Sequence, residues 1–390
     1  MQRLRNACRE LRADGISAAL VSTHENVAYL SGLVTPLPVT YPTETPVAFP
    51  LSLVVVNAER EEAVLVTVDG LRDVAERQNR LPRRECLAPG AELDPPGPDN
   101  RYAAAVSELL REIAGTGSSA GPGRLAIEPK ALPQALAAGL PERWGSAGQP
   151  ADAAPALERS RRRKTPEEVD ALRTAAGVGD AAQETLVRAA RSFGRTEFEL
   201  WAEILQEVFQ AAGEIVPVYG ELVTGPRTSE VHYPGGPRKR VIQRGDTGIL
   251  DISVRVNGYW TDSCNTVVFG APPSAEQARY MDASKECFSE AVKIMRPGVT
   301  CRQVSELMDR IHSQRGVSSP RYYGHQIGVT VNEQPKLVPA DESVIEAGMV
   351  FCVEPGAYAG PSGDTGARAE KTVVITERGA EVLHRFPWGF

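Results

Sequence analysis

The chain has 390 residues, of which 42% are hydrophobic and 24% are charged, and its formal net charge at pH 7 is −7. This length allows two domains with separate cores, and the composition predicts a soluble globular protein. The acidic balance argues against nucleic acid as the main partner. No apolar run approaches the roughly 18 residues that a membrane helix needs.

The N-terminal segment and the cysteines both favour the cytoplasm. Residues 1–12 are charged throughout and lack the apolar core of a signal peptide. The six cysteines are scattered and form no C-x-x-C pair, which favours reduced thiols over disulfides or a zinc ribbon. We therefore expect a cytoplasmic protein without membrane association.

The first part of the chain alternates predicted helices and strands. The helices are expected at residues 1–15, 24–31 and 101–114, and the strands at 18–21, 51–56, 63–67 and 124–127. This alternation predicts an α/β domain over residues 1–158. A proline-rich loop at residues 35–50 is predicted to be an ordered flap or a contact surface.

The second part of the chain is predicted to be an α+β domain over residues 159–390. A stretch rich in Ala, Pro and Gly and then basic, residues 140–164, is interpreted as the linker or a solvated face. After it, the T/S-x-x-E/Q pattern of a helix capping box recurs at Thr165, Thr196, Ser274 and Thr300. It predicts helices near 166–191, 197–212, 275–295 and 301–315, beside strands near 249–268, 349–354 and 369–376.

Residues 249–268 are predicted to form a β-hairpin that turns at the Asn-Gly pair 257–258, because both residue types tolerate positive φ. Counting back from the turn pairs Val256 with Tyr259, Ser253 with Asp262 and Asp251 with Cys264. Side chains alternate along a strand, so Asp251 and Asp262 share one face as diagonal neighbours. Two carboxylates on an apolar sheet repel each other unless they share a proton or hold a divalent cation, and buried surroundings favour the cation.

Three later segments add a histidine and two acids in apolar settings. His325 lies between glycines in Y-Y-G-H-Q-I-G, and Glu354 ends an apolar strand before a Pro-Gly turn. Glu370 begins another strand, where an ion pair with Arg368 or Lys371 is the alternative interpretation. Four carboxylates and one imidazole are too rich in oxygen for a structural zinc site and suit two hard ions such as Mn²⁺. Such a pair favours hydrolysis of an amide or related C–N bond.

The order and spacing of these segments resemble a known family. The patterns D-x₁₀-D, G-H-x-I-G, E-P-G and R-x-E are similar to those of the pita-bread metallopeptidases, which include Xaa-Pro aminopeptidase, prolidase, methionine aminopeptidase and creatinase. The segment H-E-N-V-A-Y-L-S-G resembles the creatinase/prolidase N-terminal domain. The resemblance implies a C-terminal pita-bread catalytic domain (159–390) preceded by a smaller creatinase-type α/β domain (1–158).

The resemblance also implies roles for the matching residues and for the partners. Asp251 chelates one metal ion, Asp262 and Glu370 bridge both, His325 and Glu354 hold the second, and His232 faces the substrate. Glu354 also acts as general acid/base on the water that bridges the metals. Two divalent ions are implied, Mn²⁺ first, with Co²⁺ or Zn²⁺ as alternatives. A homodimer is implied as well, in which the loop 35–50 narrows the cleft of the neighbouring chain.

Four departures from the family pattern are expected to lie on the substrate side. Asn332 stands where a second histidine is usual, and Lys336 stands near the usual arginine. Asn can donate a hydrogen bond to a carbonyl oxygen but supplies no proton. Ser253 replaces the usual glycine, and C-N-T at 264–266 replaces T-R-T.

The predicted function is that of a dinuclear metal hydrolase of the Xaa-Pro peptidase type, with a peptide as substrate and Glu354, His232 and Asn332 as catalytic residues. The altered Asn332 and Lys336 motivate the alternative, a creatinase- or ectoine-hydrolase-like enzyme that cleaves a C–N bond of a small non-peptide metabolite. A third hypothesis is a binding module without catalytic activity. It would be indicated by the loss of one or more of the predicted metal ligands.

Overall fold

The computed structural model describes residues 1–34, 52–86, 101–114, 124–132, 149–231 and 235–390. It divides into two compact units, Met1–Arg161 and Arg162–Phe390, which are described one at a time. The loop at residues 35–50 and the predicted catalytic residue His232 lie outside the described residues. No helix in the described ranges combines the length and the hydropathy that a membrane span requires.

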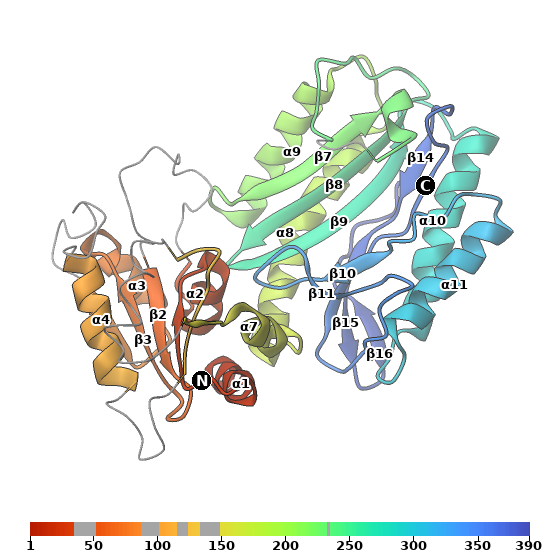
Figure 1. Ribbon diagram of the computed structural model, residues 1–390. Coiled ribbons are helices and arrows are strands. Elements are labelled where there is room, and N and C mark those ends of the chain that lie inside the picture. The colour runs from red at the N-terminus through yellow and green to blue at the C-terminus, as the bar shows by residue number, and fades with distance from the viewer. Residues whose placement is uncertain (35–51, 87–100, 115–123, 133–148, 232–234) are drawn as a thin grey trace. The chain divides into compact units, whose positions relative to one another are not determined.

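The first unit is built on a mixed sheet in the order β4-β3-β2-β1-β5-β6 (Figure 1). Its strands are β1 (Ala18–Val21), β2 (Ser52–Asn57), β3 (Glu62–Thr67), β4 (Arg83–Cys86), β5 (Leu125–Ile127) and β6 (Ala151–Asp152). Its helices are α1 (Gln2–Ala13), α2 (His24–Ser31), α3 (Arg72–Gln78), α4 (Arg101–Ala114) and α7 (Ala154–Arg161), with a 3₁₀ turn at Asp69–Leu71. Apolar residues of α4 pack on the sheet and form the core of this unit.

The second unit carries two larger sheets, ordered β7-β8-β9 and β11-β10-β12-β15-β16, and the pair β13-β14. Its helices are α8 (Pro166–Ala189), α9 (Glu197–Ala212), α10 (Ala275–Ile294) and α11 (Cys301–Gln314), with a 3₁₀ turn at Gly225–Thr228. Its first strands are β7 (Val218–Thr224), β8 (Thr247–Val256), β9 (Tyr259–Val268), β10 (Gly324–Gln326) and β11 (Glu333–Lys336). The remaining strands are β12 (Val350–Val353), β13 (Gly356–Tyr358), β14 (Gly366–Arg368), β15 (Lys371–Thr376) and β16 (Gly379–Val382).

The four predicted capping boxes are all formed. The side chains of Thr165, Thr196, Ser274 and Thr300 each accept a hydrogen bond from the backbone N–H three residues on. The side-chain oxygen of the Glu or Gln at that position accepts a hydrogen bond from the backbone N–H of the cap residue. Each box satisfies two backbone donors that the first helical turn leaves unpaired. The helices therefore begin where the sequence predicts, and α8 ends two residues earlier than expected.

The predicted hairpin is confirmed together with its register. Asn257 and Gly258 have φ values of 51° and 85°, as a two-residue turn of this type requires. The strands β8 and β9 pair Val256 with Tyr259, Ser253 with Asp262 and Asp251 with Cys264. The two aspartates are therefore held on the paired strands β8 and β9.

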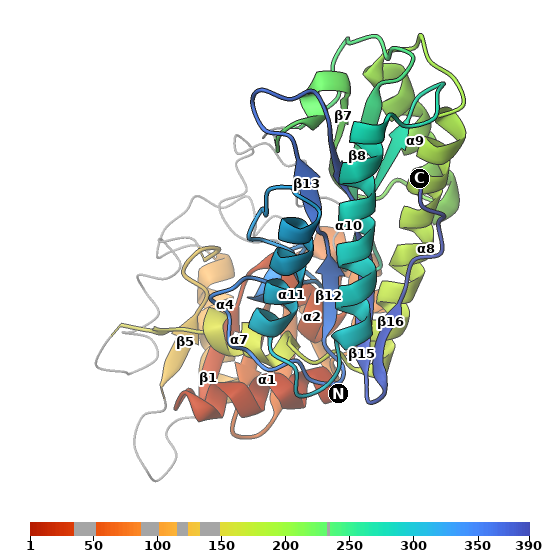
Figure 2. The same cartoon turned by 90° about the vertical axis from the view of Figure 1, so that its right-hand side faces the viewer.

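Helices cover the outer faces of both sheets, α8 and α9 on one and α10 and α11 on the other (Figures 1 and 2). The strand residues that pack against them are Leu250, Ile252 and Val254 of β8, Val267 of β9, Phe351 and Val353 of β12, and Val373 and Ile375 of β15. Asp251, Asp262, Cys352 and Glu370 alternate with these residues and face the opposite side. A bridge between Cys264 and Glu370 joins the two sheets at that side.

Candidate metal centre

Two groups of side chains on the inner side of the sheets could each hold a metal ion. Within each group, all potential ligand atoms lie within 4.8 Å of one another. One group is Asp251, Glu354 and Glu370, and the other is Asp262, His325, Cys352 and Glu370. The five residues predicted as metal ligands are all in these groups, and Glu370 belongs to both. Cys352 was not predicted, although it lies in the apolar strand β12, two residues before Glu354.

Glu370 is buried, at 1% exposure, and neither of its carboxylate oxygens has a hydrogen-bond partner within the described residues. The ion pair with Arg368 or Lys371 is not formed. Arg368 contacts Asp251 and Glu221 instead, and the Lys371 ammonium donates to the carbonyl oxygen of Phe386 at 2.6 Å. The carboxylate of Glu370 is thus left facing other acids.

Among the residues that the structure describes, the buried Glu128 and Glu197 are paired, which sets Glu370 apart. Glu128, in the first unit, accepts hydrogen bonds from the backbone N–H groups of Ser22 and Thr23 at 2.6 and 2.7 Å. Glu197 accepts from the Thr224 N–H at 3.0 Å and contacts Arg227. Buried charge is costly without such partners, so the unpaired oxygens of Glu370 fit a site that receives a cation.

The imidazole of His325 is set up as a neutral ligand. Its Nδ1 lies 2.9 Å from the carbonyl oxygen of Gln326, which can only accept, so Nδ1 carries the proton. The lone pair of Nε2 then points to Glu354 Oε1 at 3.4 Å and Asp262 Oδ2 at 3.8 Å. Burial lowers the pKa of His325 to about 4, which keeps the ring neutral at pH 7. A lone pair that faces ionised carboxylates is favourable with a positive ion between them.

The four carboxyl groups hold their protons strongly in the absence of a cation. Burial raises the pKa of Asp251, Asp262, Glu354 and Glu370 above the ordinary values, and the mutual repulsion of the groups adds to this effect. Opposite charge lowers such pKa values, and a divalent ion is the strongest source of it. Oxygen-rich donors with a single imidazole match Mn²⁺-like ions. The residues present therefore fit the two metal ions that were predicted.

Arg368 was not predicted to act at the site, although it opens the R-x-E pattern. Its guanidinium contacts Asp251, lies 2.6 Å from Glu221 Oε1, and donates to the Tyr358 hydroxyl at 2.8 Å. Glu221 lies directly opposite Asp251 across β7 and β8. Two facing acids repel each other, and Arg368 compensates both.

The departures from the family pattern do not all lie on the substrate side. Ser253 lies on the face of the predicted metal ligands, since its hydroxyl donates to Asp262 Oδ1 at 2.9 Å. The expectation is wrong for Asn265, which points to the opposite face of β9. There its amide donates to the carbonyl oxygen of Pro387 at 3.1 Å, and its oxygen accepts from the Gly389 N–H at 3.0 Å. Asn265 therefore fastens the C-terminal tail.

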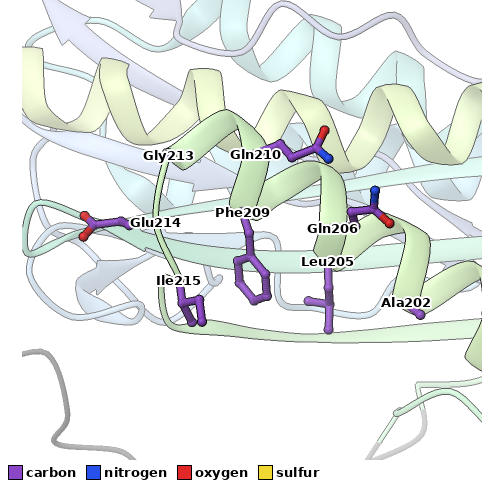
Figure 3. Close-up of a pocket in the computed structure, with 8 residues that line it drawn as sticks. All are labelled: Ala202, Leu205, Gln206, Phe209, Gln210, Gly213, Glu214 and Ile215. Atoms are coloured by element: carbon purple, nitrogen blue, oxygen red, sulfur yellow. The ribbon is translucent and has the colours of Figure 1, made fainter.

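A separate apolar hollow lies along the C-terminal end of α9. Its lining is Ala202, Leu205, Gln206, Phe209, Gln210, Gly213, Glu214 and Ile215 (Figure 3). The side chains of Leu205, Phe209 and Ile215 project to the same side of the helix and the loop after it. With a single carboxylate and no imidazole in the lining, this hollow offers no hydrolytic chemistry.

Comparison with known proteins places the chain in a family. The model of metallopeptidase family M24 matches residues 170–377, and that of the creatinase/prolidase N-terminal domain matches residues 3–162. The chain is 29% identical to the Xaa-Pro dipeptidase of Pyrococcus furiosus over 222 residues, and 32% identical to the probable dipeptidase PepE of Mycobacterium tuberculosis over 238 residues. These matches span 56% and 59% of this chain and only 62% and 60% of the relatives.

The fold is shared over the whole chain. The crystal structure of the prolidase from Pyrococcus horikoshii OT3 superposes with a TM-score of 0.77 at 22% identity, covering 100% of this chain and 99% of that one. The second unit thus has the predicted pita-bread fold, and a creatinase-type α/β domain precedes it. With the M24 model matching more than half of its residues, the chain belongs to metallopeptidase family M24.

Proposed function

We propose that the protein is a dinuclear metal hydrolase of the Xaa-Pro peptidase type. The observation that carries the proposal is Glu370, a buried carboxylate shared by two groups of donors and unpaired in the described structure. The names of the relatives support the substrate class, since they include Xaa-Pro dipeptidases. The whole activity remains our proposal because the matches span about three fifths of those relatives.

Following the family resemblance, Asp262 and Glu370 would serve both ions, Asp251 one of them, and His325 with Glu354 the other. Glu370 is the donor common to both groups, and Glu354 lies near Asp251 as well as 3.4 Å from His325 Nε2. When bound, two such ions lower the pKa of a water between them and polarise the scissile carbonyl. Manganese is the proposed metal, on the hardness of the donors.

Glu354 is the proposed general acid/base. Its carboxyl group lies at the edge of the cluster, 14% exposed, so it can reach both the ligands and a substrate. As a base it accepts the proton of the attacking water, and as an acid it delivers that proton to the leaving nitrogen. Asn332 is exposed and keeps one amide N–H for the substrate carbonyl, while the other N–H serves Tyr322. His232 is proposed to face the substrate on the resemblance alone.

A metal-dependent peptidase assay tests the proposal. The protein is stripped with a chelator, reloaded with Mn²⁺, Co²⁺ or Zn²⁺, and given Xaa-Pro dipeptides and longer Xaa-Pro peptides. We expect turnover that requires metal and two ions per chain by elemental analysis. Two bound ions without any peptide turnover would exclude the substrate class and leave the metal centre standing. If the protein binds no metal, both the proposed metal centre and the proposed substrate class are excluded.

The creatinase- or ectoine-hydrolase-like alternative is favoured by two residues at the site. Asn332 supplies no proton where the family usually has histidine, and Lys336 cannot form the planar two-point grip of an arginine on a carboxylate. A screen of small amides and guanidino compounds with the metal-loaded protein decides between the two. Normal efficiency on proline peptides excludes this alternative.

The remaining details of the proposal concern location and assembly. We propose a cytoplasmic homodimer in which the loop at residues 35–50 narrows the neighbouring cleft and limits substrate length. Deleting the loop is expected to increase activity on longer peptides relative to dipeptides. Unchanged ratios of kcat/KM between the two would contradict this role.

A further inference from the structure

Lys164 ends the basic stretch before α8, and its side chain is buried. The side chain is only 1% exposed, and the backbone N–H donates to the carbonyl oxygen of Gly348 at 2.8 Å. The next residue, Thr165, is the N-cap of α8, so Lys164 is fixed at the start of a long helix. A buried ammonium is costly unless it is paired. The partners of Lys164 therefore indicate why a charge is placed there.

The ammonium of Lys164 holds the base of the loop between β10 and β11. It donates to the side-chain oxygen of Gln326 at 2.8 Å and to Glu333 Oε2 at 3.1 Å. Gln326 is the last residue of β10, Glu333 is the first residue of β11, and the two face each other in the ladder. One cation thus joins the two ends of the loop at residues 327–332.

The strand β11 depends on such a contact more than its neighbour β10 does. The pairing steps from His325–Lys336 to Gln326–Glu333, so β11 advances three residues (336 to 333) while β10 advances one. Pro335 lies within this irregular stretch and has no N–H to donate. β11 is also the edge strand of its sheet. Side-chain contacts must therefore supply what the backbone ladder does not.

The metal side of the loop is held independently of Lys164. The other edge of β10 pairs in regular register with β12, with His325 opposite Cys352 and Gln326 opposite Phe351. This ladder fixes the backbone of the predicted ligand His325. Loss of Lys164 should therefore disturb the loop and β11 and leave the ligand in place.

Glu333 passes the contact with Lys164 on to the loop. Its second oxygen, Oε1, accepts hydrogen bonds from the Thr330 hydroxyl at 3.0 Å and from the Thr330 N–H at 3.4 Å. A Cβ atom at Gly328 would lie 3.0 Å from the same oxygen, so the carboxylate packs directly on the loop backbone. The loop is thus shaped around a carboxylate that Lys164 holds.

The loop ends at Asn332, which lies beside the metal cluster. The Asn332 amide donates to the Tyr322 hydroxyl at 3.2 Å, and the Tyr322 ring is stacked on that of His325, with centroids 6.4 Å apart. Asn332 directly precedes Glu333, so the place of its side chain follows from that of the buried carboxylate. Lys164 and Asn332 are therefore linked through one residue.

We infer that Lys164 is a positioning residue for the substrate side of the centre, and that it acts by fixing Glu333 and with it Asn332. The inference rests on the proposed function, in which Asn332 donates to the substrate carbonyl. A misplacement of about 1 Å in such a group can cost about 100-fold in rate. Because Lys164 acts through Asn332, its removal should cost no more than the loss of Asn332 itself.

A pair of substitutions separates positioning from stability. K164M alone leaves Glu333 buried without its cation and should destabilise the fold. K164M/E333M removes both charges, and replacing a buried ion pair by apolar side chains of similar volume is often neutral or stabilising. The double variant should therefore regain stability without regaining the bonds between Glu333 and Thr330.

The neighbouring arginine provides a matched control. The guanidinium of Arg163 lies 3.5 Å from the Glu346 carboxylate, and these side chains are 64% and 51% exposed. Exposed ion pairs contribute little to stability. R163M removes a positive charge from the same basic stretch and should leave the loop, the stability and the turnover as they are.

Hydrogen exchange measures the loop without reference to activity. The full chain is exchanged in deuterated buffer, and the peptide that covers residues 327–333 is followed by mass spectrometry. We expect this peptide to exchange at least about 5-fold faster in K164M and K164M/E333M than in the wild type, and R163M to match the wild type. T330V removes the hydroxyl bond to Glu333 and keeps the ion pair, so it tests the same contact even if K164M folds poorly. It should also exchange faster.

Kinetics on Xaa-Pro peptides measure the consequence for Asn332. With the Mn²⁺-loaded protein, we expect kcat to fall about 100-fold in N332A and about 10-fold or more in K164M/E333M, with little change in KM. The triple variant N332A/K164M/E333M should be no slower than N332A. The Kd for Mn²⁺ of K164M/E333M, from calorimetric titration, should stay within twofold of the wild-type value.

The outcomes separate this inference from the proposed function. Wild-type exchange of the loop in K164M and T330V overturns the inference, as does a K164M/E333M protein that keeps the wild-type kcat. Losses that multiply in the triple variant overturn the claim that Lys164 acts through Asn332. Wild-type protein that turns over no Xaa-Pro peptide overturns the proposed substrate class. In that case, faster loop exchange in K164M still supports the contact, and unchanged exchange overturns it.

Discussion

Replacing Glu370 by glutamine should have opposite effects on the stability of the metal-free protein and on metal binding. The substitution keeps the shape of the side chain and removes its ability to carry a negative charge. In the metal-free protein, burial and the charges of Asp262 and Asp251 raise the pKa of Glu370 well above its ordinary value. Folding must then supply a proton to Glu370 at neutral pH. Glutamine needs no proton, so E370Q should stabilise the metal-free protein, although it removes a shared ligand.

The size and pH dependence of this effect can be estimated. An unfolded glutamate has a pKa of about 4.3, so taking up a proton at pH 7 costs about 3–4 kcal/mol. The glutamine amide is itself buried without partners, which offsets roughly 1–2 kcal/mol of that gain. The net stabilisation is about 2 kcal/mol, or roughly 4–8 °C in Tm for a unit of this size. Below pH 4 the wild-type carboxyl group is protonated in the folded and the unfolded state, so only the cost of the buried amide remains and E370Q should be slightly less stable than the wild type there. Its advantage should appear and grow as the pH rises to 7.

Manganese should reverse the order of stability. At a free concentration of about 100 Kd, a bound ion stabilises the wild type by about 2.7 kcal/mol, and E370Q should lose most of this gain. The assay is thermal unfolding at pH 4 and pH 7, with chelator and with Mn²⁺. E370Q that melts below the wild type at pH 7 without metal, or that gains as much from Mn²⁺, would refute the reasoning.

Glu333→Gln is the matched control for this experiment. Glu333 is also buried, at 3% exposure, but its carboxylate lies 3.1 Å from the ammonium of Lys164. Breaking one side of a buried pair typically costs about 3–5 kcal/mol. E333Q should therefore destabilise the protein to the same extent with and without Mn²⁺. The Glu→Gln substitution is thus expected to stabilise the metal-free protein at position 370 and to destabilise it at position 333, although both side chains are buried.

Two further predictions concern protons and Arg368. Because the pKa values of the four carboxyl groups are raised, Mn²⁺ must displace protons at pH 7, and its apparent affinity should increase with pH. Titrations in two buffers of different ionisation enthalpy should give different heats, and equal heats would contradict proton release. Arg368→Met leaves the half-buried Glu221 without its guanidinium partner, so the metal-free protein should lose about 1–3 kcal/mol in urea unfolding. An unchanged midpoint would show that Arg368 does not compensate this acid.

Sequence reasoning succeeded where the determining interactions are local. The hairpin register follows from two turn residues and the alternation of side chains, and each helix start follows from a pattern of four residues. It was less successful where the partner is distant. Lys164, in a basic run interpreted as a linker or a solvated face, is buried against Glu333 and Gln326, more than 160 residues away in sequence. Charge composition alone does not reveal such a partner.

The same limit explains what was missed at the site. Glu221 comes from β7, a strand without a strong sequence pattern, and it faces Asp251 only because of the register between β7 and β8. Arg368 reaches both acids from β14, 117 residues after Asp251. A signal was present in hindsight, since a lone arginine two residues before a ligand in an apolar strand requires a buried anion. Finding which anion required the packing of the sheets.

The placement of Arg368 makes the two metal positions unequal. The Asp251 carboxylate already contacts a guanidinium, so a cation at that position meets both a partly compensated anion and a nearby positive charge. On the other side, Asp262 accepts a hydrogen bond from Ser253, and His325 is neutral. The position at His325 should therefore fill first. Mn²⁺ titration should show a tight and a weak step, and His325→Ala should remove the tight one, because the imidazole contributes only to that position.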